Sequence, residues 1–308
     1  QQVDRVLRQV RVGDMALDPL PTEQDLFREL GLAYIPPELR EDQGEFEAAE
    51  DNALPRLLEW TDLKGSLHNH STWSDGRQSL EDIVAHAQDL GCAYWAITDH
   101  SRSSVQARGL DVARLREQRK AIDALNRRLE DEGSEFRLLA GSEVDILKGG
   151  LDFPDEVLAQ LDVVVASLHV PSRDAAENTR RLIEAARNPL VHMLGHPSGR
   201  LLLERDAYPV DLHAVVDACA ETGTWIELNA SPARMDMDWR LWIHARRKGV
   251  RCVINCDAHR QEHFGFLRLG ASVARKGWLT RNDVINTRPL AELRELLNAK
   301  RERSGTRS

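Results

Sequence analysis

Nine histidine, aspartate and glutamate residues recur where apolar runs end along the chain. They are His68, His70, Asp75, His100, Glu143, His169, His196, Asp257 and His259. Imidazole and carboxylate groups together bind divalent ions such as zinc, manganese or iron. One tetrahedral ion takes about four ligands, so nine ligands predict two or three ions that share a bridging carboxylate. A centre of this kind is typical of hydrolysis.

The local spacing favours a metal site only when the motifs are taken together. His68 and His70 are two residues apart, and in an extended chain both side chains point the same way. Chance explains a lone pair of histidines equally well, and Asp75 before a glycine is usually a turn residue. A buried Glu143 requires a compensating partner, for which a metal and an arginine are the alternatives. The recurrence of such groups along the chain decides in favour of metal.

From about residue 60, short β-rich runs alternate with helical stretches. The predicted strands cover residues 62–67, 93–98, 137–142, 163–168, 191–195, 225–228 and 251–255. The predicted helices cover 79–90, 112–132, 175–187, 210–222 and 238–248. Near-continuous apolar runs suit strands that are buried on both faces, which places His192 in the core. The alternation predicts an α/β architecture of parallel strands with right-handed crossovers.

Closure of these strands would give a distorted seven-stranded (β/α) barrel that resembles the TIM type. Barrels of this type carry their chemistry at the C-terminal ends of the strands. The nine candidate ligands follow those ends, and Glu143 is expected to end the third strand. Positions far apart in the sequence would therefore meet at one point.

Residues 1–58 differ from the rest of the chain because they are rich in proline and contain an acidic stretch over 38–51. A short helix is predicted over 22–30, followed by an extended turn and a mobile linker. We therefore expect an N-terminal arm over 1–58 and a catalytic domain over 59–308. Because the chain begins with glutamine, we expect a fragment or a processed product.

Composition excludes several classes. No apolar run approaches the ~20 residues of a membrane span, so we expect no membrane partner. The net charge of −9 argues against broad electrostatic capture of nucleic acid, although bound ions would make a cleft locally positive. Cys92, Cys219, Cys252 and Cys256 form no CxxC pair, and free thiols in a cytoplasmic protein are expected.

The ordered motifs resemble the PHP (polymerase and histidinol phosphatase) family over about residues 60–298. They are His68-Asn69-His70, Asp75, Thr98-Asp99-His100, Gly141-Ser142-Glu143, Ser167-Leu168-His169, Gly195-His196-Pro197 and Asp257-Ala258-His259. The resemblance implies a distorted seven-stranded barrel with a trinuclear metal centre. It implies one ion at His68, His70, Glu143 and Asp257, a second at Glu143, His169 and His196, and a third at Asp75, His100 and His259.

Further segments resemble the PHP module of bacterial family X DNA polymerases. They cover residues 196–200, 227–230, 235–240 and 273–279, together with 31–40, which resembles the end of the thumb. The resemblance implies Mn²⁺-dependent 3′–5′ exonuclease activity and processing of DNA 3′ ends in repair. No nucleotidyltransferase palm motif precedes these segments, and a helix cap explains the Asp236 and Asp238 pair better. We expect no polymerisation by this chain alone, and an absent polymerase domain is a candidate partner.

Five basic residues near strand ends are candidate contacts to a phosphate: Arg102, Lys148, Arg200, Arg234 and Arg260. Arg200 is favoured because it lies three residues after Pro197 and an arginine can hold a phosphate bidentately. A solvated surface arginine is the alternative. Together with the carboxylates Glu143 and Asp257, Arg200 completes the expected catalytic set.

Two other functions remain open. A small-molecule phosphatase, such as a histidinol-phosphate phosphatase, would share the metal site, but the thumb-like arm and the narrower motifs speak against it. A non-catalytic module would have lost ligands, whereas all nine are present. The leading expectation is a phosphodiesterase that uses two or three divalent ions (Mn²⁺, Zn²⁺ or Fe) and acts on DNA 3′ ends.

Overall fold

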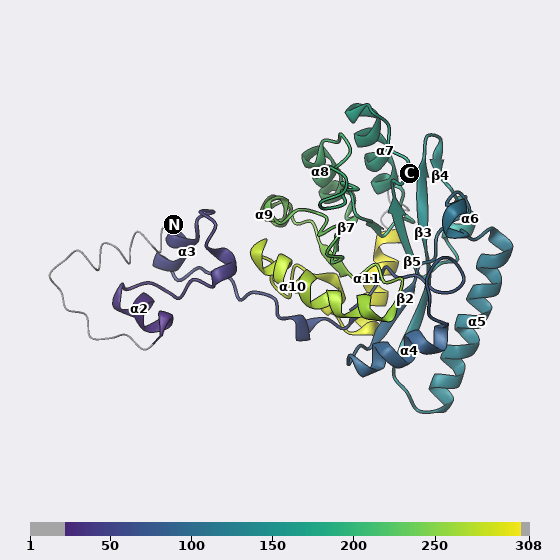
Figure 1. Ribbon diagram of the computed structural model, residues 1–308, viewed down its shortest axis with the longest axis horizontal. Coiled ribbons are helices and arrows are strands. Elements are labelled where there is room, and N and C mark those ends of the chain that lie inside the picture. Colours follow the sequence, from purple (N-terminus) through teal and green to yellow (C-terminus); the bar gives the residue numbers. More distant parts are fainter. Residues whose placement is uncertain (1–21, 303–308) are drawn as a thin grey trace. The chain divides into compact units, whose positions relative to one another are not determined.

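The computed structural model describes residues 22–302 and divides into two units (Figure 1). The first unit ends at Arg56 and the second begins at Leu57. Residues 1–21 of the expected arm lie outside the described residues.

The first unit contains the expected helix and one that the sequence did not predict. Helix α2 (Glu23–Glu29) begins after Thr22, whose side chain accepts the backbone N–H of Asp25. A 3₁₀ turn, η1, follows at Pro37–Leu39. The mobile linker expected over the acidic stretch is wrong, because α3 (Glu45–Glu50) lies there. The buried Glu45 carboxylate accepts the N–H groups of Asp42 and Gln43 and so holds the turn before this helix.

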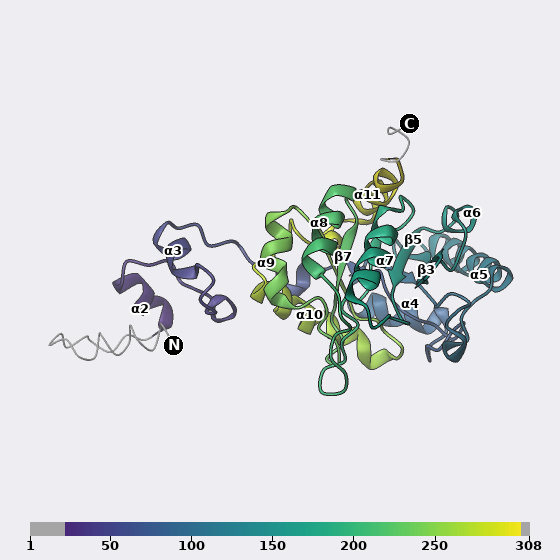
Figure 2. The ribbon, with the colours of Figure 1, turned by 90° about the horizontal axis from the view of Figure 1, so that it is seen from above.

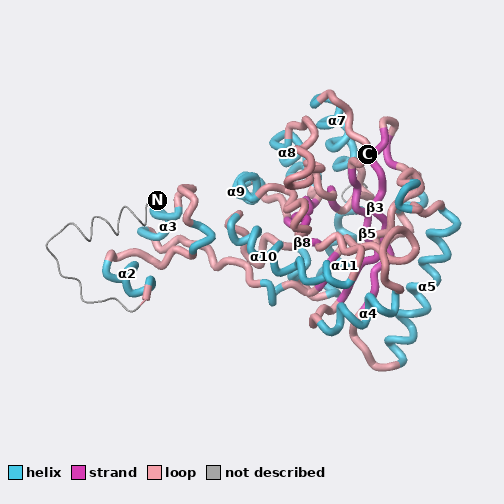
Figure 3. Tube along the Cα trace, in the orientation of Figure 1, coloured by secondary structure: helices cyan, strands magenta, loops and turns pink. Residues whose placement is uncertain are grey.

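The second unit is built on a parallel sheet whose strands follow one another around a barrel (Figures 1 and 3). In spatial order these are β1 (Gly65–Ser66), β2 (Tyr94–Ile97), β3 (Arg137–Leu147), β5 (Val163–Ser167), β6 (Met193–Leu194), β7 (Trp225–Asn229) and β8 (Cys252–Asn255). All neighbours on this path pair in parallel. The predicted distorted seven-stranded (β/α) barrel is confirmed.

The seam between β8 and β1 is closed by side chains and loops rather than by a strand ladder. The Oδ1 atom of Asn255 accepts the backbone N–H of Leu67 at 2.7 Å. Just beyond, the N–H of His70 donates to the carbonyl of Ala258 at 2.9 Å. These bonds tie the two loops that carry the first and the last candidate ligands.

Strand β3 corrects one expectation. Glu143 does not end this strand, which continues to Leu147 and then turns back into the short antiparallel β4 (Gly150–Leu151). The strand pairs with β2 through Ala140 and with β5 from Gly141 onward, so its second half extends past the barrel rim. Because side chains alternate along a strand, Glu143 and Asp145 share one face.

Helices surround the barrel (Figure 2). The predicted helices are present as α4 (Leu80–Asp89), α5 (Val112–Asp131), α7 (Ala175–Arg187), α8 (Leu212–Thr222) and α9 (Trp239–Arg247). Three were not predicted: α6 (Asp155–Leu158), α10 (Phe266–Lys276) and α11 (Leu290–Glu302). The connecting 3₁₀ turns are η2 (Trp60–Asp62), η3 (Val105–Ala107), η4 (Gln261–Gly265) and η5 (Ile285–Thr287). Turn η2 includes Asp62, the first residue of the predicted first strand, and the strand itself is limited to β1.

Apolar side chains from alternate strand positions fill the inside of the barrel. Tyr94, Val163 and Trp225, the first residues of their strands, pack there with Leu293 and Leu297 of α11. Helix α11 therefore covers the N-terminal ends of the strands and leaves the C-terminal ends for the site.

Two compositional expectations can be compared directly with the structure. All four cysteines are free; Cys219, Cys252 and Cys256 are buried, whereas Cys92 is half-buried. Within residues 22–302, no helix has both the length and the apolar character that crossing a bilayer requires.

Candidate metal centre

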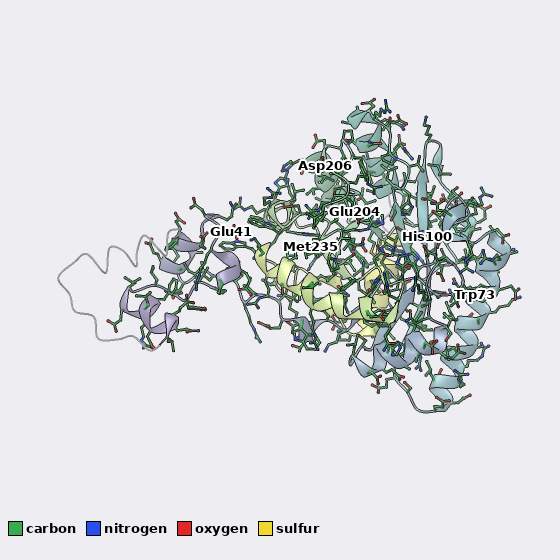
Figure 4. The ribbon with its side chains drawn as sticks, viewed as in Figure 1. Glu41, Trp73, His100, Glu204, Asp206 and Met235 are labelled. Atoms are coloured by element: carbon green, nitrogen blue, oxygen red, sulfur yellow. The ribbon has the colours of Figure 1, made fainter. Side chains whose placement is uncertain are left out.

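The nine candidate ligands meet at the C-terminal end of the barrel. His68 and His70 follow β1, His100 follows β2, and His169 follows β5. A cavity of about 340 Å³ opens there. It is lined by Asp75, His100, Glu143, His169, His196, Asp257 and His259, with His100 labelled in Figure 4. His68 and His70 lie fully buried beneath it.

Four overlapping groups in the described residues could each hold an ion. They are His70, Asp75, His100 and His259; His68, His70 and Glu143; His68, His196 and Asp257; and His100, Glu143 and His169. Every one of the nine residues belongs to at least one group. The overlap suits several ions close together rather than one.

The separations between donor atoms match those around a metal. Ligands ~2.1 Å from a tetrahedral ion lie roughly 3.4 Å from one another. Glu143 Oε1 lies 3.4 Å from His68 Nε2 and 3.2 Å from His169 Nε2. Asp75 lies 3.6 Å from His100 Nε2 and 3.5 Å from His259 Nε2. Three of these four distances are longer than a typical hydrogen bond, and all four suit shared coordination.

Several buried imidazole nitrogens also have no hydrogen-bond partner in the described part of the chain. They are His68 Nε2, His70 Nδ1, His100 Nδ1 and His196 Nδ1. His100 Nδ1 lies 2.8 Å from Glu143 Oε2, but the two atoms are not aligned for a hydrogen bond. Because an unsatisfied buried polar atom is costly, so many together point to absent partner atoms. The donor set therefore fits divalent cations.

The electrostatics of the centre favour bound cations. Burial raises the pKa of Glu143, but His169, His68 and His100 outweigh it and hold this pKa well below its usual value. Burial lowers the pKa of His100, but Glu143 and Asp75 outweigh that effect and raise it to about 10. Without metal the cluster holds protons in its place, so ions and protons compete for the same atoms.

Glu227, on β7, supports the ligands from behind and was missed by the sequence analysis. Its Oε1 atom lies 2.7 Å from His68 Nδ1, and its Oε2 atom accepts the backbone N–H of His196 at 2.7 Å. Asn255 Nδ2 donates to Oε1 at 2.9 Å. The charged residue inside the apolar run of β7 was the available signal.

Two more carboxylates have similar positions. Asp145 Oδ1 lies 2.5 Å from His169 Nδ1, and Asp145 also accepts the hydroxyl of Ser104. The fully buried Asp99 accepts the N–H of Ser71 and so holds the loop that follows His70. Its side-chain partners are Ser71, Ser74 and Gln118, none of which is a candidate ligand.

The backbone is bent where two candidate ligands sit. His196 has a φ of 25° and Asp257 a φ of 49°, both in the left-handed region that residues other than glycine rarely adopt. Such conformations cost free energy and persist where the surroundings impose them. A Cβ atom on Gly76 would come within 2.5 Å of the carbonyl of His70, so the turn after Asp75 requires glycine.

The basic residues fall into two sets. Arg234 lines the cavity and lies 3.6 Å from Asp257, and Arg205, which the sequence analysis missed, lines it as well. The other four predicted contacts do not line it. Arg102 pairs with Asp152, the Nε atom of Arg260 donates to His263, and Lys148 is exposed beside β4.

Arg200 holds the loop that precedes α9. Its guanidinium binds Asp238 at 2.7 Å and donates to the carbonyls of Arg234 and Met235. Asp238 caps α9 by accepting the N–H of Arg240, which confirms the predicted cap. Each guanidinium nitrogen of Arg200 thus has a partner within the protein, whereas Arg234 and Arg205 line the cavity.

Comparison with known proteins agrees with this geometry. A family model described as the PHP domain matches residues 66–231. The DNA polymerase/3′-5′ exonuclease PolX of Bacillus subtilis (strain 168) is 41% identical over 280 residues, which cover 90% of this chain and 48% of that protein. The chain thus spans about half the length of this relative.

Shorter proteins are similar as well. A probable phosphatase of Thermoanaerobacter sp. (strain X514) is 29% identical over 244 residues, covering 73% of this chain and 96% of that protein. Histidinol phosphate phosphatase from Lactococcus lactis subsp. lactis Il1403, solved with zinc, L-histidinol and phosphate, matches with a TM-score of 0.52 at 17% identity. The match covers 70% of this chain and 93% of that one, which shows a shared fold. The chain belongs to the PHP domain family.

Proposed function

We propose that the protein is a metal-dependent phosphodiesterase that removes nucleotides from DNA 3′ ends. The observation that carries this proposal is the convergence of nine imidazole and carboxylate groups on one cavity. It is supported by the 41% identity, over 90% of this chain, to a DNA polymerase/3′-5′ exonuclease. Such ligands suit manganese, zinc or iron.

Three ions would be held by three sets of ligands. The family resemblance implies that His68, His70, Glu143 and Asp257 would hold one ion, and His70 Nε2 lies 3.1 Å from Asp257 Oδ1. Glu143 would share a second ion with His169 and His196, whose Nε2 atom lies 2.9 Å from Glu143 Oε1. Asp75, His100 and His259, which belong to one group together with His70, would hold the third. Glu143 would belong to two of these sets.

When bound, divalent ions supply activation of water and neutralisation of charge at a phosphoryl group. The side chains of the protein position the metal ligands and the substrate. Glu227 and Asp145 orient His68 and His169, while Arg234 and Arg205 bind and orient the substrate phosphate in the cavity. No side chain in the cavity is assigned as a general acid.

DNA is favoured as substrate by the extent of the PolX match. A match that covers 90% of the chain must extend into the first unit, because the second unit is a smaller share of the chain. We therefore propose that the first unit corresponds to the end of a polymerase thumb, and that a polymerase domain is a partner. Free cysteines agree with a cytoplasmic location.

A small-molecule phosphatase is the second candidate. It is supported by the similarity to a probable phosphatase along almost all of that protein's length. The fold shared with histidinol phosphate phosphatase agrees with it too.

The test compares the two substrate classes on one preparation. The metal-depleted chain is reloaded with Mn²⁺, and kcat/KM is measured for a single-stranded oligonucleotide and for histidinol phosphate. Asp257→Asn removes one ligand, and Asp123→Asn, an exposed carboxylate on α5, is the matched control. A higher kcat/KM for the oligonucleotide than for histidinol phosphate supports the proposal, provided that this activity is lost in Asp257→Asn and kept in Asp123→Asn. Rapid release of phosphate from histidinol phosphate, with the oligonucleotide left intact, would contradict the proposal and support a small-molecule phosphatase.

A further inference from the structure

Exposed apolar side chains lie on loops that contribute to the lining of the metal cavity. Among the described residues, the large exposed apolar side chains include Val105 (77% exposed), Val170 (76%), Leu202 (38%) and Leu203 (107%). We call these four residues the apolar rim. They lie on three separate loops, which follow β2, β5 and β6.

Each rim residue lies within two positions of a residue that lines the cavity. Val105 precedes Gln106 and Ala107, and Val170 lies between His169 and Pro171. Leu202 and Leu203 follow Leu201 and precede Arg205 on the loop between β6 and α8. This loop projects from the barrel in Figure 2. Three loops that contribute to the lining of the cavity thus each carry exposed apolar side chains.

The loop between β6 and α8 carries Leu202 and Leu203, and we call it the leucine loop. Hydrogen bonds within this loop and to Ala233 hold it in place. The N–H of Leu201 donates to the carbonyl of Arg205 at 2.8 Å, and Arg205 donates to the carbonyl of Gly199 at 2.8 Å. The N–H of Leu202 donates to the carbonyl of Ala233 at 2.6 Å. Leu203 has a φ of 66°, a costly conformation for a leucine. The fold therefore keeps two leucines in water, where exposed apolar groups mark binding surfaces.

The cavity is lined by apolar as well as ionic side chains. Besides the imidazoles and carboxylates, Leu168, Pro171, Leu201 and Tyr208 line it, and we call these four residues the apolar wall. Arg205 and Arg234 add positive charge to the lining. A nucleotide presents a matching pair of surfaces, an anionic phosphate and a flat base with apolar faces.

The charges on the leucine loop bear on which part of a bound DNA strand would face Leu202 and Leu203. Glu204 and Asp206, labelled in Figure 4, flank Arg205 on this loop. Carboxylates repel phosphates, whereas Arg234 and Arg205 attract them, so a bound strand would place its backbone toward the two arginines. Its bases would then face Leu202 and Leu203.

We propose that the apolar rim and the apolar wall bind the last unpaired bases of a DNA strand whose terminal phosphodiester reaches the metal centre. This inference rests on the proposed function and narrows its substrate to single-stranded or frayed 3′ ends. In a paired end the base faces are hidden in the stack, and exposing them costs free energy. An unpaired end offers them without that cost.

The test uses the double variant Leu202→Ser/Leu203→Ser in the full chain with Mn²⁺. Leu269→Ser is the matched control, because Leu269 is a 40% exposed leucine on α10. Three substrates are compared: a duplex with a three-nucleotide unpaired 3′ tail, the same duplex with a blunt end, and methyl p-nitrophenyl phosphate. The small diester has no neighbouring base and reports on the chemistry of the centre alone.

The wild-type protein is expected to prefer the unpaired tail over the blunt end. In the double variant, the ratio of kcat/KM on the tail to kcat/KM on the small diester should fall about tenfold, and in Leu269→Ser it should not. An unchanged ratio in the double variant overturns the inference while the proposed function stands. A wild-type protein that hydrolyses the small diester but no DNA overturns the proposed function, and this inference with it.

Discussion

Glu227 Oε1 lies 2.7 Å from His68 Nδ1, and both side chains are completely buried. A carboxylate at this position fixes the proton on Nδ1, so the lone pair of Nε2 points into the centre toward Glu143. The other carboxylate oxygen holds the N–H of His196, where the backbone is bent. One side chain thus orients two candidate ligands from different strands.

The first prediction concerns this contact. In Glu227→Gln, the amide cannot match the charge of the carboxylate, and the ring of His68 loses its fixed tautomer. Metal affinity should fall roughly 10- to 100-fold, the usual effect of removing such a partner. Titration of the metal-depleted protein with Mn²⁺ measures the change, with Glu221→Gln, an exposed glutamate on α8, as the control. Equal affinity in the two variants would show that Glu227 has only a packing role.

The sequence could predict the ligands but not the residues behind them. His68, His100 and His169 stand in short motifs after strands, where the type of residue and its position already indicate metal. Glu227 and Asp145 lie within strands and act through contacts between distant segments, which spacing cannot reveal.

The errors in the fold have physical causes as well. Helix α11 is stabilised by packing beneath the barrel, a tertiary contact that a local pattern does not contain. Strand β3 runs past Glu143 because β5 and β4 continue to pair with it. Arg200 was favoured from its distance to Pro197, but the partners that occupy it come from residues 234–238. Spacing alone does not show which donors are already used.

The second prediction is that metal binding releases protons. Burial lowers the pKa of His169, but Glu143 and Asp145 outweigh it and raise this pKa to about 9, and His100 behaves similarly. These raised values mean that both rings carry protons at pH 7.5 in the metal-free protein, and an ion must displace them. Affinity for Mn²⁺ should therefore rise as the pH increases from 6.5 toward 9.

Calorimetric titration at pH 7.5 in PIPES and in Tris checks this point, because the two buffers differ in their enthalpy of ionisation. The account predicts an apparent binding enthalpy that differs between the buffers by an amount corresponding to at least one proton released. Identical enthalpies would contradict it.

The third prediction concerns stability in acid. His192 Nδ1 accepts the backbone N–H of Val164 at 3.0 Å inside the barrel. Burial, followed by the charge of Arg301, lowers the pKa of His192 to about 3. A lowered histidine pKa means that the unfolded chain binds the extra proton first. Stability is then fully present above pH 6.5 and is lost, by about 1.4 kcal/mol per pH unit, as the pH falls toward 3.

Urea unfolding of the metal-free protein at pH 7.5 and pH 5 measures this dependence. In His192→Asn the amide oxygen can still accept the N–H of Val164 but does not titrate, so the loss of stability between the two pH values should be smaller than in the wild type. His213→Asn, at an exposed histidine, should keep the wild-type loss. An equal loss in all three proteins would assign the acid sensitivity to other groups.

The fourth prediction separates two arginines. Arg234→Gln removes a positive charge that lines the cavity and should raise KM for an oligonucleotide about tenfold or more, with the metal content unchanged. Arg200→Gln removes the contacts to Asp238 and to the carbonyl of Arg234, and should lower the free energy of unfolding by about 1–3 kcal/mol. Steady-state kinetics, metal analysis and urea unfolding of both variants provide the comparison. The reverse pattern, with KM sensitive only to Arg200, would restore Arg200 as the phosphate contact.

The most direct test of the central claim follows a 5′-labelled single-stranded oligonucleotide on a sequencing gel. With Mn²⁺, the wild-type protein should produce a ladder that shortens step by step from the 3′ end. The ladder should be absent with EDTA and in Asp257→Asn, and present in Asp123→Asn. A full-length strand under conditions in which methyl p-nitrophenyl phosphate is hydrolysed, or cuts scattered along the strand, would contradict a 3′-end phosphodiesterase.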